Sequence, residues 1–102
     1  MQLEIVSVYD VKADTYATPV FVPSQLVAQR SFSDVVNHKD SPINKHPEDY
    51  RLFMLGFFDD ESGEVEKYQK PVLICTANEV FRIQPIQIHN PEQEDTPEKE
   101  ED

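Results

Sequence analysis

The order of apolar and polar positions along the chain predicts four strands around one helix. In residues 2–9, Leu3 and Ile5 fall on one face of an extended chain, and Val6 and Val8 fall on the other. Because both faces are apolar, we expect a well-buried strand at the beginning of the domain.

A second strand is predicted over residues 16–22, where Val20, Phe21 and Val22 follow one another. Pro19 has no N–H group to donate to a neighbouring strand. This segment should therefore lie at an edge of the sheet or at a bulge.

The next segment has helical periodicity. Ser24 can cap the first turn, and Ala28, Phe32, Val35 and Val36 then recur at i, i+4, i+7 and i+8. These four residues form one apolar stripe, which we expect to pack on the sheet. Residues 37–47 follow with the composition of a loop.

Residues 50–58 form the most apolar segment, and strict alternation would make both of its faces apolar. One face would carry Tyr50, Leu52 and Met54, and the other Phe53, Leu55 and Phe57. With a single helix, only one face of the sheet is covered. We therefore predict either a homodimer with Phe53, Leu55 and Phe57 in its interface, or that residues 72–88 fold back over this face.

A hairpin is predicted after this strand, with Gly63 in the turn and residues 64–70 as the partner strand. Pro71 interrupts the pattern before a short apolar run at residues 72–75. The predicted fold class is α+β, a small antiparallel sheet with one helix packed on one face in the order ββαββ. The pattern does not assign residues 76–88 to a helix or a strand, and a continuation of the apolar run toward Val80, Phe81, Ile83 and Ile86 is left open.

The last fourteen residues differ in composition from the rest. Residues 89–102 carry seven Asp and Glu against Lys99, and their only apolar residues are prolines. We expect a single domain over residues 1–88 and a disordered acidic tail over residues 89–102. The tail would compete with nucleic acid, dock to a basic partner, or simply keep the protein in solution.

Length and composition exclude several functional classes. A chain of 102 residues has no room for a deep active site, and Gly56 and Gly63 stand apart, so there is no phosphate-binding loop. The single cysteine forms no internal disulfide, and no apolar run approaches the roughly 20 residues that cross a bilayer. These features favour a protein of the cytoplasm without a membrane segment.

We expect no enzyme, no catalytic residue, no metal and no cofactor. Cys75 lies in an apolar run and is interpreted as an inert core thiol. The acidic and histidine side chains that could bind a metal lack the spacing of known sites. They are His38, Asp40, His46, Glu48 and Asp49.

Nucleic-acid binding is a candidate function. The basic side chains gather between the predicted helix and the aromatic strand, where Tyr50, Phe53, Phe57 and Phe58 offer rings for base stacking. The candidate binding residues are Arg30, Lys39, Lys45, His46, Tyr50 and Arg51. Against this hypothesis, nearby carboxylates cancel these charges, the formal net charge is −11, and aromatic strand residues are more often core than platform.

The order of motifs resembles that of a known family. It combines VYD at residues 8–10, PVF at 19–21, AxRxFxDxVN at 28–37 and KHPEDYxLFxLGxFDD at 45–60. This order resembles the small nonstructural protein of gokushoviruses, the single-stranded DNA microviruses of bacteria, also called DNA-binding protein or nonstructural protein C. The long acidic tail departs from shorter members of that family.

The resemblance implies a non-enzymatic phage protein in the cytoplasm of the infected bacterium. It would bind single-stranded DNA or the viral replication complex during genome replication and packaging. The alternative is an acidic protein-interaction module, for example a DNA mimic, that engages the procapsid, the replication initiator or a host factor.

Overall fold

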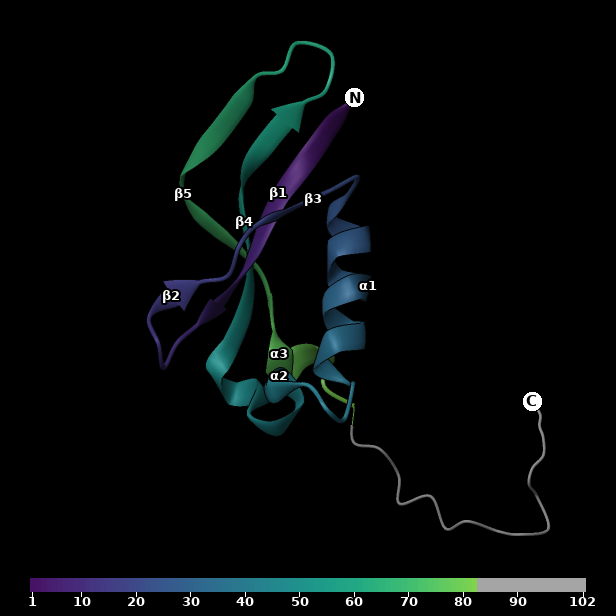
Figure 1. Cartoon of the computed structure of the whole chain (residues 1–102), viewed down its shortest axis with the longest axis vertical. Helices are drawn as coiled ribbons and strands as arrows, with labels where there is room; N and C mark the ends of the chain where they lie inside the picture. Colours follow the sequence, from purple (N-terminus) through teal and green to yellow (C-terminus); the bar gives the residue numbers. More distant parts are fainter. Residues whose placement is uncertain (83–102) are drawn as a thin grey trace, which may run out of the picture.

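The computed structural model describes residues 1–82 and has the predicted α+β architecture (Figure 1). Five antiparallel strands form one sheet, and the longest helix lies along one side of it. The strands are β1 (Gln2–Asp10), β2 (Thr15–Tyr16), β3 (Val20–Val22), β4 (Tyr50–Asp59) and β5 (Val65–Thr76). The helices are α1 (Gln25–Val36), α2 (Pro42–Lys45), the 3₁₀ helix η1 (Pro47–Asp49) and α3 (Ala77–Val80).

The sheet has the order β2-β1-β4-β5, and β3 also pairs with β1. The segment predicted as one strand over residues 16–22 is divided into β2 and β3, and Pro19 lies between them. Both pieces pair with β1 alone, so the predicted edge position is confirmed.

The predicted hairpin joins β4 and β5. Gly63 has a φ of 78°, a conformation that glycine adopts without steric cost, and its N–H donates to the carbonyl of Asp59 at 2.8 Å. Pro71 does not end the strand as predicted. β5 continues to Thr76, with a shift in register between the pairs Gly56–Lys67 and Met54–Val72 that accommodates the proline.

A bulge in β4 changes the predicted alternation. Ile5 pairs with Gly56 and Val6 pairs with Met54, so Leu55 has no partner in the ladder. Because opposite residues of an antiparallel pair share a face, the bulge separates Phe53 from Phe57. Phe53 pairs with Ser7 and Phe57 with Glu4, which lie on opposite faces of β1. The prediction that Phe53, Leu55 and Phe57 share one face is therefore wrong.

We call the two sides of the sheet the helix face and the open face. The helix face carries Val6, Val8, Leu52 and Cys75. The open face carries Ser7, Tyr9, Arg51, Phe53 and the side chains in register with them.

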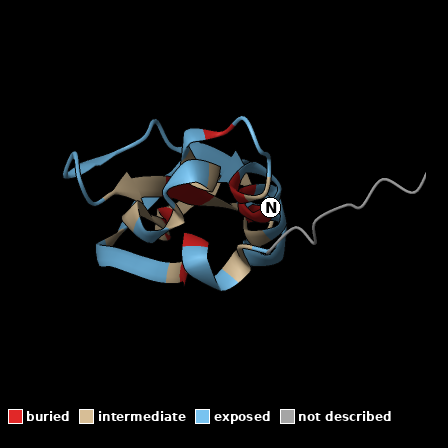
Figure 2. Cartoon of the chain, turned by 90° about the horizontal axis from the view of Figure 1, so that it is seen from below, coloured by how far each residue is buried: buried red, intermediate tan, exposed pale blue. Residues whose placement is uncertain are grey.

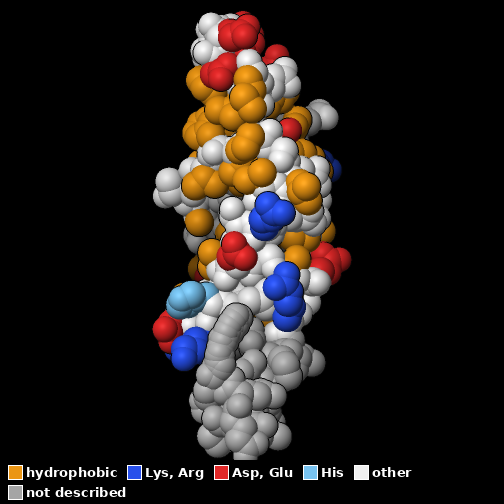
Figure 3. Space-filling view, turned by 90° about the vertical axis from the view of Figure 1, so that its right-hand side faces the viewer, with side chains coloured by type: hydrophobic (Ala, Val, Ile, Leu, Met, Phe, Trp, Pro, Cys, Tyr) orange, Lys and Arg blue, Asp and Glu red, His pale blue; other side chains and the backbone are white. Residues whose placement is uncertain are grey.

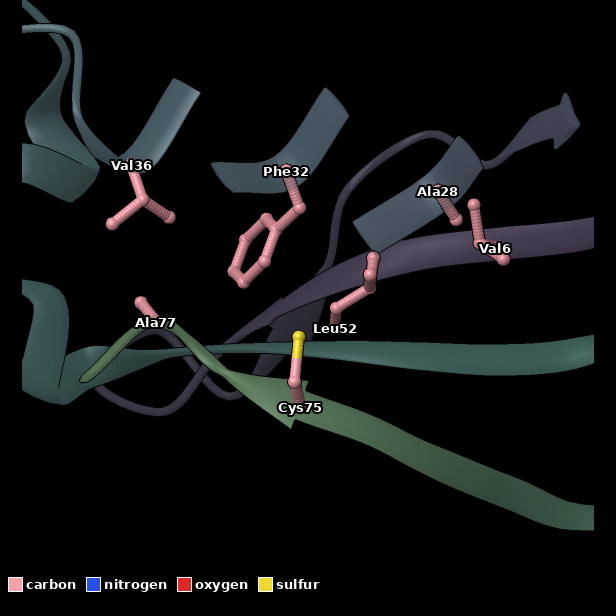
Figure 4. Packing of buried hydrophobic residues seen from close by; sticks show 7 residues of the cluster. All are labelled: Val6, Ala28, Phe32, Val36, Leu52, Cys75 and Ala77. Atoms are coloured by element: carbon pink, nitrogen blue, oxygen red, sulfur yellow. The ribbon is translucent and has the colours of Figure 1, made fainter. Parts of the chain in front are cut away.

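The core lies between α1 and the helix face. Ser24 caps α1, because its Oγ accepts a hydrogen bond from the N–H of Val27 at 3.2 Å. Most buried apolar residues lie between the helix and the strands (Figure 2), where their side chains meet in one cluster (Figure 4). Ile5 and Ser7 are also buried, but they belong to the open face of β1. The cluster contains Val6, Ala28, Phe32, Val36, Leu52, Cys75 and Ala77. Val35, predicted in the same stripe, is 47% exposed and lies at its margin.

Residues 37–47, predicted as a loop, contain α2 and lead directly into η1. Ser41 is the N-cap of α2, and its Oγ accepts a hydrogen bond from the N–H of Ile43 at 3.0 Å. Composition alone missed this helix, because four residues are too few to show helical periodicity.

Asn37 fixes the last described residues to the end of α1. Its Nδ2 donates to the carbonyls of Ser33 at 2.7 Å and Val80 at 2.9 Å, and its Oδ1 accepts from the N–H of Arg82 at 2.7 Å. Residues 72–82 thus continue the sheet and return to α1 rather than covering the open face. The predicted tail at residues 89–102 and the rest of the 76–88 segment from residue 83 onward lie outside the described residues.

A substitution at Gly56 tests the pairing of β4 with β5. A Cβ atom at this position would overlap the carbonyl oxygen of Glu66 and lie 2.8 Å from the Cα of Lys67. Because these are backbone atoms, Gly56→Ala forces the strands apart, and we expect the free energy of unfolding in urea to fall by about 1–3 kcal/mol. Gln69→Ala, at an exposed site on β5, should change it by less than about 0.5 kcal/mol. Equal stability of the two variants would contradict this account.

Candidate nucleic-acid interface

Three aromatic rings form a cluster at one end of the open face. Tyr9 of β1 lies 4.7 Å from Tyr16 of β2, measured between ring centroids. Phe53 of β4 lies 6.0 Å from Tyr9 and 5.8 Å from Tyr16, in edge-to-face arrangements. Such tilted contacts are favourable for aromatic quadrupoles and hold the rings in place. Tyr16 nevertheless remains 43% exposed.

A second aromatic pair lies further along the same face. Phe21 of β3 and Phe58 of β4 have centroids 5.5 Å apart at 83°. Phe21 pairs with Ile5 and Phe58 pairs with Leu3, which places both rings on the open face. Phe21 is 51% exposed. The open face therefore presents aromatic side chains at two places along its length, and no described helix packs on it.

The charged residues in the ladder are divided between the two faces. Every acidic residue at a paired strand position lies on the helix face, namely Glu4, Asp10, Asp59 and Glu66. The charged residues at paired positions on the open face are Arg51 and Lys67. The described strands thus place cations without neighbouring ladder carboxylates beside the aromatic rings.

Asp14, in the turn between β1 and β2, is hydrogen-bonded to the ring cluster. Its Oδ1 accepts a hydrogen bond from the hydroxyl of Tyr9. This hydrogen bond raises the pKa of Tyr9, and partial burial and the negative charge of Asp14 act in the same direction, whereas Arg51 opposes them. The hydrogen bond to the Asp14 carboxylate holds the ring of Tyr9 in its orientation at the edge of the cluster.

The candidate binding residues do not come together. Arg30 projects from the exposed side of α1, Lys39 follows that helix, and Lys45 and His46 lie at the end of α2. Arg51 is on the open face. On the side of the molecule that carries α1, Lys and Arg side chains are separated by acidic and apolar ones (Figure 3).

Tyr50 is not a free stacking platform. It pairs with Asp10 on the helix face and packs against the core cluster. Burial raises the pKa of its hydroxyl, and the charges of Asp10 and Asp49 add to the effect.

Sequence reasoning missed Tyr9, Tyr16, Phe21 and Lys67 as members of the open face. Each residue lies on a different strand, and only the register between the strands brings them together. The one available signal was the repeated placement of aromatic residues in segments predicted as strands, because the faces could not be matched across the bulge at Leu55.

One group of potential metal ligands also comes together in residues 1–82. His46, Glu48 and Asp49 have ligand atoms within 4.8 Å of one another. The His46 Nδ1 lies 3.7 Å from the Glu48 carboxylate, and both side chains are well exposed. A solvated side-chain contact accounts for this geometry, and we assign no metal to it. Within the same residues, no helix is long and apolar enough to cross a membrane.

A helix on one face of an antiparallel sheet and aromatic side chains on the other define a small α+β protein with one free sheet face in its described residues. The chain matches the family described as Phage ORF5 protein over residues 3–80, from β1 to α3, and it belongs to this phage protein family. No curated protein and no solved structure matches it. The predicted phage origin is thus confirmed, whereas the assignment to gokushoviruses stays a prediction.

The hydrogen bond between Tyr9 and Asp14 gives a prediction about pH. The pKa of Tyr9 in the folded protein is raised above the ordinary value of 10.0. The contribution of this contact to stability is therefore present below pH 10 and is lost as pH rises through the folded pKa. Asp14→Asn removes the negative charge, and asparagine accepts the φ of 57° found here, so the pKa of Tyr9 should fall toward 10.0. NMR titration of ring-labelled tyrosine measures this shift, and an unchanged Tyr9 pKa would argue against the contact.

Proposed function

We propose that this phage protein binds single-stranded DNA through the open face and assists viral genome replication and packaging in the cytoplasm of the infected bacterium. The observation that carries the proposal is the open face itself, with exposed aromatic rings, two cations and no carboxylate at its paired positions. Membership of a phage protein family supports the viral context. The motif order supports a gokushovirus as the source.

Stacking of bases on aromatic rings explains the preference for single strands. In duplex DNA the faces of the bases are stacked on each other and are not accessible. In a single strand they are free to stack on rings such as Tyr16 and Phe21, which are exposed on the open face. Arg51 lies opposite Tyr9 in the β1–β4 ladder, so its guanidinium can contact a phosphate next to a base stacked on this cluster.

For a DNA strand bound to the open face, the charges on that face affect the affinity more than the formal net charge of −11. Phosphate contacts act over roughly 10 Å at 0.1 M salt, so carboxylates on the far side of the sheet are partly screened from a strand bound to the open face. With few cations, the affinity should depend only moderately on salt, and stacking should contribute a large share of it.

Substitutions on the open face should weaken binding in fluorescence anisotropy with a labelled single-stranded oligonucleotide. Tyr16→Ala and Phe21→Ala each remove one ring, and a loss of about 1 kcal/mol or more per stacked base predicts at least a roughly five-fold higher Kd. Arg51→Gln should also reduce the slope of log K against log salt by about 0.7. Both rings are exposed, so the folded state should persist, as circular dichroism can check.

Arg30→Gln and Lys45→Gln are the matched charge controls, since both residues are exposed but lie off the open face. Leu26→Ala is the apolar control, at an exposed position on α1. These three variants should bind like the parent protein. If they weaken binding while Tyr16→Ala and Phe21→Ala do not, the site lies in the loops and not on the sheet.

The acidic segment at residues 89–102 should oppose DNA binding. It carries a formal charge of −6, more than half of the net charge, and therefore competes with phosphate for the same cations. Deleting it should lower the Kd for single-stranded DNA, and the difference should shrink as salt is raised. Identical affinities of the two proteins at low salt would exclude this competition.

The acidic positions of the helix face favour a second candidate, an interaction module for a protein partner. Asp10 and Asp59 are half-buried at the two ends of the β1–β4 ladder, and an acidic surface can imitate the phosphates of DNA. The partner would be the procapsid, the replication initiator or a host factor. Absence of DNA binding by both the full chain and the tail-deleted protein would favour this candidate.

A further inference from the structure

An apolar groove runs between α1 and the strands at the β3 edge of the helix face. Its volume is about 170 Å³. The strand side is formed by valines of β1 and β3, the helix side by α1, and Ile43 of α2 closes one end. Ser31 is the single polar residue in its lining. A groove of this composition favours an apolar occupant over a charged ligand.

The rim of the groove continues onto the exposed surface of α1. Val27, Ser31 and Val35 follow at i, i+4 and i+8, which places them in one row along the helix. Val35 is 47% exposed, and Val20 on the opposite rim is 56% exposed. The side of the molecule that carries α1 accordingly shows a broad area of apolar side chains (Figure 3). The groove and the helical row adjoin each other, so they form one continuous apolar patch rather than scattered surface residues.

Two charged residues lie side by side along one side of this row. Arg30 and Asp34 are exposed on α1, and neither forms an ion pair within residues 1–82. When two copies of α1 pack antiparallel about a two-fold axis at Ser31, each Val27 faces the Val35 of the other copy. Arg30 of each copy then lies close to Asp34 of the other. The surface is thus complementary to itself in shape and in charge.

We infer that α1 and the adjacent groove form a homodimer interface, with the two α1 helices antiparallel. The small side chain of Ser31 at the centre lets the helices approach closely, and the valines of each copy cover the groove of the other. This interface replaces the predicted one of Phe53, Leu55 and Phe57. It leaves the open face of each copy exposed, so it does not depend on the proposed DNA binding.

A charge-exchange experiment on the full chain tests this interface by sedimentation equilibrium. The parent protein should have twice the monomer mass. Arg30→Glu places two carboxylates together across the two-fold axis, and Asp34→Arg places two guanidinium groups together, so each should raise the dimer Kd roughly ten-fold. The double variant, with both substitutions, should restore dimerisation because the pairs are re-formed with opposite polarity.

Val35→Glu should give a monomer, since it puts a charge into the apolar contact with Val27 of the other copy. Leu26→Glu is the matched control, because Leu26 is 69% exposed on the same helix but lies roughly 140° around it from Ser31. That variant should remain dimeric. Circular dichroism establishes that each variant is folded.

A monomeric parent protein overturns the inference, as does a dimer that Val35→Glu leaves intact. Failure of the double variant to dimerise overturns the antiparallel pairing of Arg30 with Asp34. Loss of the dimer by substitutions on the open face, such as Phe21→Ala, would move the interface to that face and would contradict the proposed DNA site at the same time. Loss of DNA binding with an intact dimer would affect the proposed function alone.

Discussion

A single residue of β4, Leu55, decides which side chains share a face of the sheet. It has no partner in the ladder, so the residues before it and after it are displaced by one position relative to strict alternation. Because of this displacement, Phe58 lies on the same face as Phe53, and Phe57 lies on the opposite one. With regular pairing, Phe58 would lie on the helix face, and Phe21 would lose its partner on the open face. The candidate site thus depends on an irregularity of the backbone rather than on a sequence motif.

The elements of the fold could largely be predicted from the sequence. The stripe of Ala28, Phe32 and Val36 identified α1 and its buried side, and Gly63 identified the hairpin. Both signals come from residues close together in the sequence, so they can be recognised without knowledge of the tertiary structure. The shift in register that lets β5 pass through Pro71 could not be predicted, because it depends on the pairing between two strands.

The candidate site was much harder to predict. Clustering of basic residues along the sequence pointed to Arg30, Lys45 and Arg51, but these lie on α1, at the end of α2 and on the open face of the sheet. Neighbourhood along the chain was a poor guide, since successive strand residues point to opposite faces. The aromatic residues of the open face come from β1, β2, β3 and β4, and only long-range pairing places them together.

The irregular course of β5 has a consequence for the behaviour of the protein at high concentration. Among residues 1–82, β5 is the last strand on its side of the sheet, and an unprotected edge of this length is a template for uncontrolled addition of further strands. Pro71 lacks the N–H that such growth requires, and the interrupted register bends the edge away from a straight line. Lys67 and Lys70 add like charges that repel another copy of the same edge. Proline, interrupted register and charge thus all disfavour the addition of a further strand to this edge, so we expect crowded copies of the protein to resist fibrous aggregation.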